Sequence, residues 1–431
     1  MKTLRPSFLS IIPLIVFIAV FLGSGLINKD FYALPSPIAA LLGIVTAFLI
    51  FKGSFKQKTE TFLKGIGDDK ILTMCVIYLL AGAFATVTKA SGSVDTIVNI
   101  GITYVSPQYF AAGVLVMASF LSFASGTSVG SIVTLAPIVI ELAEKSGAPL
   151  GFVGAALLCG AMFGDNLSVI SDTTIAATQS LGCHMKDKLK ANLKLALPAA
   201  FAAFVAFILF GSGISPTQNL QESQASHWLL MMPYILVICF SLMGMNVFIT
   251  LFSGLVFAGG LGLFYDKFGW MEFAGLTYKG FTEMTEIFLL SLLTGGLAAL
   301  VEKAGGITFL LRTTERFIQG PKSALAGIGA LVGITNLAVA NNTIAILISG
   351  KIAKEINDKY HLPSKVSASQ LDIFACYVQG LIPYGAQILI LISLSNFKIG
   401  YLELLTNAYY LHFLIIITLI STLTFKIKTH D

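Results

Sequence analysis

Long blocks of apolar residues determine the class of this chain. The first runs from Phe8 to Ile27, and similar blocks of about 20 residues, the length with which an α-helix crosses ~30 Å of hydrocarbon, recur along the sequence. Charged residues make up only 11% of the chain, against about 25% in soluble domains, so too few remain to coat a water-facing surface. We therefore predict an all-α polytopic membrane protein. Predicted single spans cover residues 8–27, 35–51, 71–89, 195–212, 228–244, 247–264, 283–302 and 402–424.

Four further segments carry polar interruptions. Residues 151–181 and 368–395 are each predicted to form one broken transmembrane helix. Residues 107–144 and 323–358 each contain two apolar stretches of about 16 residues joined by a small polar tip, and such a stretch is too short to cross the membrane alone. We expect both segments to be re-entrant hairpins that enter and leave on the same side.

The positions of Lys and Arg predict the orientation, because cytoplasmic loops hold an excess of both. With the N-terminus inside, 21 of the 27 cations fall on the inner side. Treating either hairpin as a full crossing would move one cluster of cations outside. We expect a multi-pass protein of the cell (inner) membrane with both termini in the cytoplasm. The six cations on the outer side are Lys29, Lys89, Lys145, Lys267, Lys279 and Lys398.

The chain also contains an internal repeat with an offset of 214 or 215 residues. Five predicted spans separate equivalent points, and an odd number turns the second copy upside down. We predict two inverted repeats of five transmembrane helices, residues 1–212 and 213–431, each with one re-entrant hairpin and one broken helix. Chance matches among 40 glycines would not explain the inverted charge bias, and this architecture is typical of secondary transporters. Equivalent segments are Lys64-Gly65 and Lys279-Gly280, Ala81-Gly82 and Gly295-Gly296, and Ser125–Ser128 and Ala340–Thr343.

The first broken helix carries two acids, Asp165 and Asp172. An acid on the lipid face near the membrane centre costs ~2.5 to 3.5 kcal/mol, so this run is expected to face a hydrated interior. We expect the helix to break at Gly164 and to restart at the N-cap signature Ser171-Asp172-Thr173-Thr174. Binding and capping both stay open for Asp172, whereas Asp165 is favoured as a binding group over a satisfied core acid. The candidate binding residues here are Asp165, Asn166, Ser168, Asp172 and Thr173.

The two hairpin tips are predicted to complete the site. Each tip places a helix C-terminus with free carbonyls beside a helix N-terminus with free amides, which suit cations and anions respectively. A polar turn satisfied by its own caps is the alternative. The second broken helix adds amides, such as Gln387, but no acid at its break. The tip residues are Ser125, Gly126, Thr127 and Ser128 in the first hairpin and Asn341, Asn342 and Thr343 in the second, and Na⁺ is expected at Asp165, Thr127 and Asn342.

The run Gly164-Asp165-x-x-Ser168-x-x-Ser171-Asp172-Thr173-Thr174 resembles the NhaC-type Na⁺/H⁺ antiporters of the ion transporter superfamily, and the resemblance covers nearly the whole chain. The tips resemble the Ser-Asn-Thr motifs that hold Na⁺ in that superfamily, with Gly126 in place of Asn and Asn341 in place of Ser. The resemblance implies a homodimer, a scaffold that carries a sliding transport unit, and Na⁺ or H⁺ as the coupling ion, with no other cofactor. Asn166-Leu167 departs from the antiporter pattern and is closer to a branch regarded as amino-acid permeases.

Two functions of a secondary transporter therefore stay open: Na⁺/H⁺ antiport, and cation-coupled transport of an amino acid or small carboxylate through the bilayer. A channel would show a continuous polar stripe instead of two interrupted half-sites. An enzyme would need paired catalytic groups, and no nucleophile motif occurs. Nucleic-acid binding is not expected, because the cations lie between apolar blocks and form no basic stripe. The five cysteines have no CxxC spacing and are interpreted as core residues.

Overall fold

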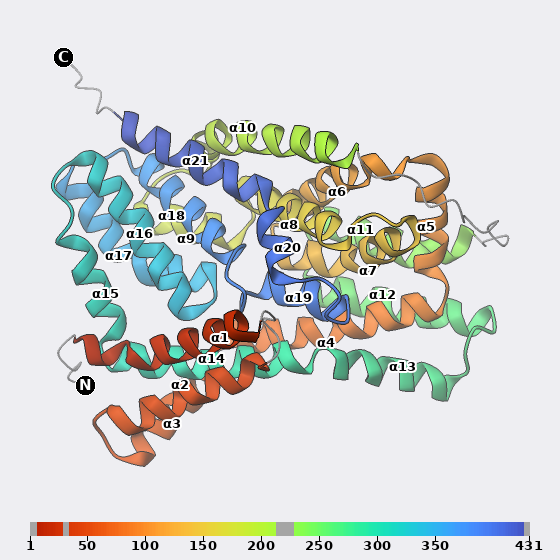
Figure 1. Ribbon diagram of the computed structural model, residues 1–431, viewed down its shortest axis with the longest axis horizontal. Coiled ribbons are helices and arrows are strands. Elements are labelled where there is room, and N and C mark those ends of the chain that lie inside the picture. The colour runs from red at the N-terminus through yellow and green to blue at the C-terminus, as the bar shows by residue number, and fades with distance from the viewer. Residues whose placement is uncertain (1–6, 29–33, 213–227, 426–431) are drawn as a thin grey trace.

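The structure, a computed structural model, describes residues 7–28, 34–212 and 228–425, and these ranges are helical apart from short connections (Figure 1). Five cations used in the predicted orientation, Lys2, Arg5, Lys29, Lys426 and Lys428, lie outside the described residues. The α-helices are α1 (Ile12–Asn28), α2 (Ser36–Ile50), α3 (Phe55–Ile66), α4 (Asp69–Ala90), α5 (Ser93–Tyr104), α6 (Phe110–Ser125), α7 (Ser128–Ser146), α8 (Leu150–Leu167), α9 (Asp172–Leu181), α10 (Met185–Gly211), α11 (Met232–Leu242), α12 (Val247–Phe264), α13 (Trp270–Glu283), α14 (Thr285–Lys303), α15 (Gly306–Glu315), α16 (Pro321–Val339), α17 (Asn342–Lys359), α18 (Ser364–Gln379), α19 (Ala386–Leu394), α20 (Tyr401–Thr406) and α21 (Tyr409–Thr424), with short 3-10 helices at Phe8–Ser10, Pro107–Tyr109 and Trp228–Met231.

The predicted apolar blocks correspond to helices throughout the described residues. Seven helical segments there are long and apolar enough to cross a membrane, and the chain is a multi-pass helical membrane protein. The arms of the predicted hairpins have 16 residues in α6, as expected, and 18 or 19 in α7, α16 and α17. With its preceding 3-10 turn the first arm reaches 19 residues, Pro107–Ser125, so length alone does not exclude a full crossing by an arm.

Glycines allow two pairs of helices to pack with their backbones in contact. Helix α4 packs on α13, and α3 packs on α14. A Cβ atom on Gly82 would lie 2.1 Å from the carbonyl oxygen of Gly280, and one on Gly65 would lie 2.5 Å from that of Gly295. No larger residue fits either crossing without moving the backbone. All four glycines belong to segments that are equivalent in the predicted sequence repeat.

The two tips have matching backbone geometry. Helix α6 ends at Gly126 with φ 71°, and α16 ends at Ala340 with φ 52°. The next residue caps the following helix in each case: Thr127 accepts from the N–H of Gly130 at 3.3 Å, and Asn341 accepts from that of Ile344 at 3.0 Å. Gly126 therefore corresponds to Ala340 and Thr127 to Asn341, 214 positions apart, one residue fewer than in the predicted pairing of Ser125–Ser128 with Ala340–Thr343. Alanine at the left-handed position is disfavoured, so the surrounding structure must hold Ala340 there.

The first broken helix is interrupted later than the sequence predicted. Helix α8 continues through Gly164 to Leu167, and the extended segment lies between it and α9. Gly164 serves close packing instead, because a Cβ atom there would lie 2.4 Å from the carbonyl oxygen of Ser119 on α6. The helix restarts within the predicted N-cap signature, and its cap is Ser171, which leaves Asp172 without the capping role that was one of its two alternatives. Ser171 caps α9 by accepting from the N–H of Thr173 at 3.3 Å.

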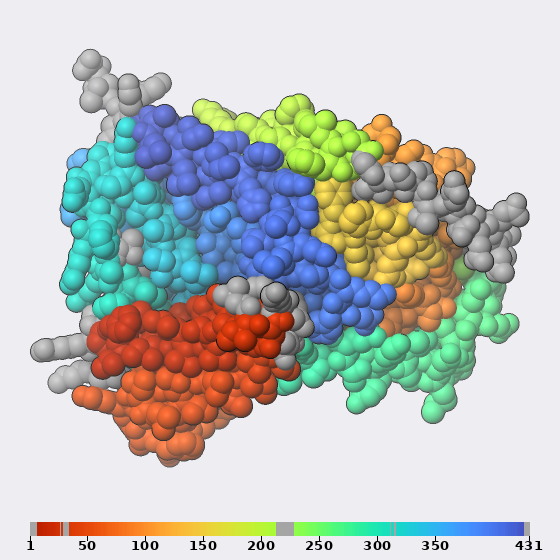
Figure 2. All heavy atoms as spheres, in the orientation of Figure 1, coloured from red at the N-terminus to blue at the C-terminus, as the bar shows by residue number. Residues whose placement is uncertain are grey.

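The two hairpins lie at opposite ends of the long axis of the molecule, α16 with α17 on the left of Figure 1 and α6 with α7 on the right. The broken helices run along them: α6 and α7 pack on α8, and α16 and α17 pack on α18. Helix α21 packs across α10, α18 and α8 and, with α20, covers the middle of the face seen in Figure 2. This arrangement brings both tips and both breaks together.

Candidate functional site

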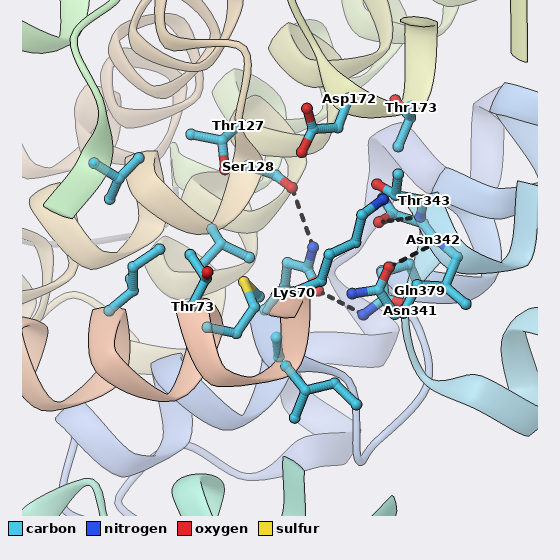
Figure 3. Close-up of a pocket in the computed structure, with 18 of the residues that line it drawn as sticks. Lys70, Thr73, Thr127, Ser128, Asp172, Thr173, Asn341, Asn342, Thr343 and Gln379 are labelled. Carbon is cyan, nitrogen blue, oxygen red and sulfur yellow. Dashed lines mark hydrogen bonds between the residues drawn. The ribbon is translucent and has the colours of Figure 1, made fainter. Parts of the chain in front are cut away.

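A cavity of about 640 Å³ lies where the two tips meet the two breaks (Figure 3). Its walls come from the tips, from the starts of α9 and α19, and from α4, α14 and the α11–α12 connection. Eleven of the thirteen predicted binding residues line it, although they come from segments far apart in the chain. They are Ser125, Gly126, Thr127, Ser128, Asp165, Asp172, Thr173, Asn341, Asn342, Thr343 and Gln387.

Asp165 lies in the last turn of α8 and is 6% exposed. The hydroxyl of Ser171 donates to Oδ1 at 2.5 Å and that of Ser128 to Oδ2 at 2.8 Å. The backbone N–H of Ser128, at the start of α7, lies 3.4 Å from the same Oδ2. Within the described residues Asp165 forms no ion pair. A buried carboxylate held only by neutral groups favours binding a proton or a metal cation.

Asp172 and Thr173 approach the cavity from the start of α9. Asp172 is exposed and points into the cavity in Figure 3. It is the first helical residue and not the cap, so its charge meets the positive end of the helix dipole. The Thr173 hydroxyl lies 2.9 Å from that of Ser171, which in turn donates to Asp165. Asp172 is therefore the more hydrated of the two acids.

Asn166 and Ser168 do not line the cavity. Asn166 turns its side chain away, and its Nδ2 donates to the hydroxyl of Tyr410 on α21 at 2.9 Å. Ser168 is 1% exposed and lies at the end of α8. The run of polar residues was predicted to face one hydrated surface, but consecutive residues of a helix point in different directions. Asp165 and Asn166 consequently face different sides of α8 and contact different partners.

A chain of hydrogen bonds joins the two half-sites. Gln379, at the end of α18, donates from Nε2 to Oε1 of Gln387 at 2.9 Å. Gln387 donates to the Ser128 hydroxyl at 3.1 Å, and Ser128 donates to Asp165. Gln379 also lies 3.3 Å from the carbonyl oxygen of Ala340 in the second tip. Gln379 stands 214 residues after Asp165, the offset of the sequence repeat, so the predicted repeat would pair this amide with that carboxylate.

The reverse side of the break contains a buried ion pair that the sequence analysis missed. Nζ of Lys188 on α10 lies 2.6 Å from Oδ2 of Asp372 on α18, and both side chains are 1% exposed. Lys188 also donates to the Thr174 hydroxyl at 2.7 Å and to the carbonyl oxygen of Asn166 at 3.3 Å. Asn192, one turn further on α10, donates to that carbonyl at 2.9 Å and to Asp372 at 2.7 Å.

Helical spacing carried a signal for this pair. Lys188 and Asn192 continue a stripe of small buried residues on α10 that includes Ala196, Ala199 and Ala203. The count of cytoplasmic cations treated Lys188 as one of four loop residues. Lys188 instead lies within α10, and its side chain is buried against that of Asp372.

Lys70 was missed in the same way. It was counted with the cytoplasmic cations, yet it lies in the first turn of α4 and lines the cavity. In Figure 3 its side chain points toward Asn342 and Thr343 of the second tip. Within the described residues it forms no ion pair. The neighbouring Asp69 also contributes to the wall.

A helical, multi-pass fold with a polar cavity between interrupted helices defines the class of membrane transporters. The model of the Na⁺/H⁺ antiporter family matches residues 5–212 and 223–427, and the chain belongs to this family. It is thus a secondary transporter of the antiporter type, and the resemblance seen in the sequence is confirmed.

Three characterised relatives span most of the chain. The Na⁺/H⁺ antiporter NhaC of Bacillus subtilis (strain 168) is 25% identical over 411 residues, covering 86% of this chain and 89% of its own length. The malate-2H⁺/Na⁺-lactate antiporter of the same organism is 24% identical over 405 residues, covering 86% of each. The arginine/ornithine antiporter ArcD of Halobacterium salinarum (strain ATCC 700922 / JCM 11081 / NRC-1) is 21% identical over 431 residues, covering 89% of this chain and 85% of its own length.

Proposed function

We propose that the protein exchanges Na⁺ for H⁺ across the cell membrane and that Asp165 binds the two ions in turn. The observation that carries this proposal is a buried carboxylate on the cavity wall with hydroxyl partners and no cationic partner among the described residues. The ionised carboxylate and the hydroxyl oxygens of Ser128, Ser171 and Thr173 suit Na⁺. Protonation removes the charge and releases the metal ion, so one group can couple the two fluxes.

Alternating access follows if the two halves are related by an inverted repeat, residues 1–212 and 213–431. The matched tip geometry and the glycine crossings support this relation. A second pair of contacts has the same spacing: the Ser122 hydroxyl donates to the carbonyl of Ala161, and Asn336 donates to that of Ala375. Two hairpins that approach one cavity from opposite sides would let the site open to each side in turn.

The membrane arrangement belongs to the same proposal. The excess of Lys and Arg supports a cytoplasmic position for both termini and for the loops before α4 and α10. The hairpins are re-entrant in this arrangement, and five helices of each repeat cross the bilayer. The family resemblance adds a homodimer, in which the hairpins and broken helices slide against a scaffold.

A second candidate function is cation-coupled exchange of a small organic solute, and the size of the cavity favours it. A volume of about 640 Å³ falls in the range of about 300–1,000 Å³ that is typical of small-molecule sites and far exceeds the space of one bare cation. Two of the relatives exchange organic solutes, according to their names: malate against lactate, and arginine against ornithine. An amino acid or small carboxylate would accompany the cation in this case.

Reconstitution tests the proposed ion exchange. Purified protein in liposomes with an internal pH indicator is given external pulses of NaCl, with KCl and choline chloride as matched controls. Sodium should move protons in the direction opposite to its own gradient, and potassium should have a much smaller effect. Equal responses to Na⁺ and K⁺, or none, would reject Na⁺/H⁺ exchange. Repeating the pulses with L-malate inside and L-lactate outside tests the second candidate.

A further inference from the structure

The cavity is reached from one end of helix α4. Its wall includes the exposed residues Asp69 and Lys70 in the first turn of this helix, and within the described residues α4 adds no wall residue after Tyr78. The first turn of α4 is cytoplasmic in the arrangement proposed above, and its last turn, which contains Lys89, is on the outer side. In that arrangement the present conformation is open to the cytoplasm and closed toward the outside.

Ion pairs join the first hairpin to its neighbours on the outer side. Nζ of Lys89 lies 2.7 Å from Oε2 of Glu141 on α7, and the Glu141 side chain is only 12% exposed. Lys145, one turn further along α7, lies 3.5 Å from Oε1 of Glu141 and also pairs with Asp95 on α5. Helices α4 and α5 both pack on α7. The hairpin therefore cannot slide along α4 without breaking the pair of Lys89 and Glu141.

The second half of the sequence contains the same charges. At the repeat offset of 214, α14 is the counterpart of α4, and α17 is the counterpart of α7. Charges of the same sign recur at four positions of these helices. Chance agreement at four positions is disfavoured, because only 11% of the residues are charged. The corresponding residues are Lys89 and Lys303, Glu141 and Glu355, Glu144 and Asp358, and Lys145 and Lys359.

The second pair is not formed in this conformation. Glu355 is exposed and forms no ion pair among the described residues. Lys303 instead donates to the hydroxyl of Thr61 on α3 at 2.5 Å. The packing differs in the same way, because α5 packs on α7 whereas its counterpart α15 packs on α16. One ion pair is thus formed and its counterpart is not, although the sequences correspond.

We propose that the two pairs are alternating latches. The outer latch, Lys89 with Glu141, closes the outer side in this conformation, and the inner latch, Lys303 with Glu355, closes the cytoplasmic side when the site opens outward. The inference rests on the proposed function, to which it adds the contacts that hold each end state. Because the loss of one latch is offset by a second of the same charges, the two conformations stay close in free energy. The bound cation can then shift the balance between them.

Cross-linking tests the proposal, because each latch should form in one conformation only. The outer latch is replaced by Lys89→Cys with Glu141→Cys, and the inner latch by Lys303→Cys with Glu355→Cys. A short bifunctional thiosulfonate should link both pairs in proteoliposomes. Each link should abolish Na⁺-driven proton movement by fixing one conformation, and cleavage of the link by a reductant should restore it.

The matched control is an outer ion pair that joins two parts of the sliding unit. Lys398, in the connection after α19, lies 2.6 Å from Glu144 on α7, and α19 packs on α7. Lys398→Cys with Glu144→Cys should therefore cross-link without loss of transport. All three double variants also carry Cys183→Ser and Cys239→Ser, because the other native cysteines are buried.

Removal of single charges measures how strongly each latch favours its conformation. Lys89→Gln should favour the outward-open conformation and Lys303→Gln the inward-open one, each by about two- to five-fold, the effect of one exposed ion pair. The readout is the labelling of Ser291→Cys, on the cavity wall, by an impermeant maleimide added to intact cells. Lys89→Gln should raise this labelling from outside, and Lys303→Gln should lower it.

The proposal is overturned if Lys303→Cys with Glu355→Cys fails to cross-link in protein that still exchanges Na⁺ for H⁺, or if the two single variants shift the labelling in the same direction. Failure of the proposed function has a different signature. If the wild type shows no Na⁺-driven proton movement while both pairs cross-link and the labelling shifts in opposite directions, the latches stand and only the ion exchange is rejected.

Discussion

Two buried carboxylates near the first broken helix, Asp165 on α8 and Asp372 on α18, have different surroundings. Asp165 faces the cavity and is held by the hydroxyls of Ser128 and Ser171. Asp372 faces Lys188 and Asn192 and lies outside the cavity. A carboxylate with only neutral partners can exchange its cation, whereas one with a buried ammonium partner keeps it. The comparison teaches that burial alone does not identify a coupling site; the partner does.

The buried pair of Lys188 and Asp372 also helps to position the end of α8, which carries Asp165. Lys188 and Asn192 both donate to the carbonyl of Asn166, the residue that follows Asp165. Carbonyls at a helix C-terminus lack intrahelical donors, so these bonds fix the end of α8 against α10 and α18. We infer that the ion pair holds the break in shape while Asp165 changes its cation.

The first and largest expected effect is that of Asp165→Asn. Asparagine keeps the size and most hydrogen bonds but removes the charge, so the variant should insert and fold normally. Sodium-driven proton movement should fall by about a hundred-fold or more, because Na⁺ loses its only ionised ligand from α8. The measurement is the internal pH response of proteoliposomes, with thermal unfolding in detergent as the folding control. A wild-type response to Na⁺ and pH would place the coupling group elsewhere, with Asp172 as the next candidate.

Lys188→Met should have the opposite effect: it should lower the stability of the protein more than its transport activity. Removing Lys188 leaves the charge of Asp372 buried without a cationic partner, which costs about 3–5 kcal/mol. The melting temperature in detergent should fall clearly, while Lys186→Met, an exposed change on the same helix, should not alter it. The double variant Lys188→Met with Asp372→Asn should recover much of the loss. A stable Lys188→Met protein that lacks transport would instead mean that the pair takes part in coupling.

The sequence predicted Asp165 and the tips, which line the cavity, but it did not predict the buried pair of Lys188 and Asp372. Asp165 was identifiable because an acid within an apolar block is costly unless it faces a hydrated interior. The tips were identifiable because small polar residues separated apolar arms. Asn166, also predicted for the site, does not line the cavity, since its direction depends on the rotation of α8 about its axis. That rotation is set by packing against α6 and α21, which a single sequence does not display.

The partner of Lys188 was beyond sequence reasoning for a further reason. Lys188 and Asp372 are 184 positions apart, so helical spacing can mark Lys188 as facing inward beside the exposed Lys186 and Lys190, but it cannot identify Asp372 as its partner. The charge count that predicts orientation treats all such residues as loop cations. Lys70 was missed for the same reason, because it too was counted as a loop cation. Rules that average over loops give the orientation and miss individual cations that turn inward.

Asn342→Ala should have a moderate effect at the second tip. Asn342 lines the cavity, whereas the cap of α17 is the side chain of Asn341. Asn342→Ala should therefore raise the apparent KM for the transported ion or solute by about three- to ten-fold, the value of one neutral hydrogen bond, at unchanged melting temperature. Asn341→Ala is the matched variant and should cost about 1 kcal/mol of stability through the lost cap. Unchanged kinetics in Asn342→Ala would leave the tip with a capping role only.

Asp172→Asn should be the mildest of the four, and it tests the comparison most directly. Asp172 lines the same cavity as Asp165, but it is exposed, and Ser171 rather than Asp172 caps α9. Its charge contributes about 0.3–1 kcal/mol through the helix dipole, and water can replace it as a ligand. We expect less than about a three-fold change in the apparent KM for Na⁺ and no change in the pH profile of exchange. If Asp172→Asn abolished Na⁺-driven proton movement as fully as Asp165→Asn, two carboxylates would share the cation. Asp165 and Asp172 would then have the same role despite their different burial. Only the contrast between Asp165 and the ion-paired Asp372 would remain.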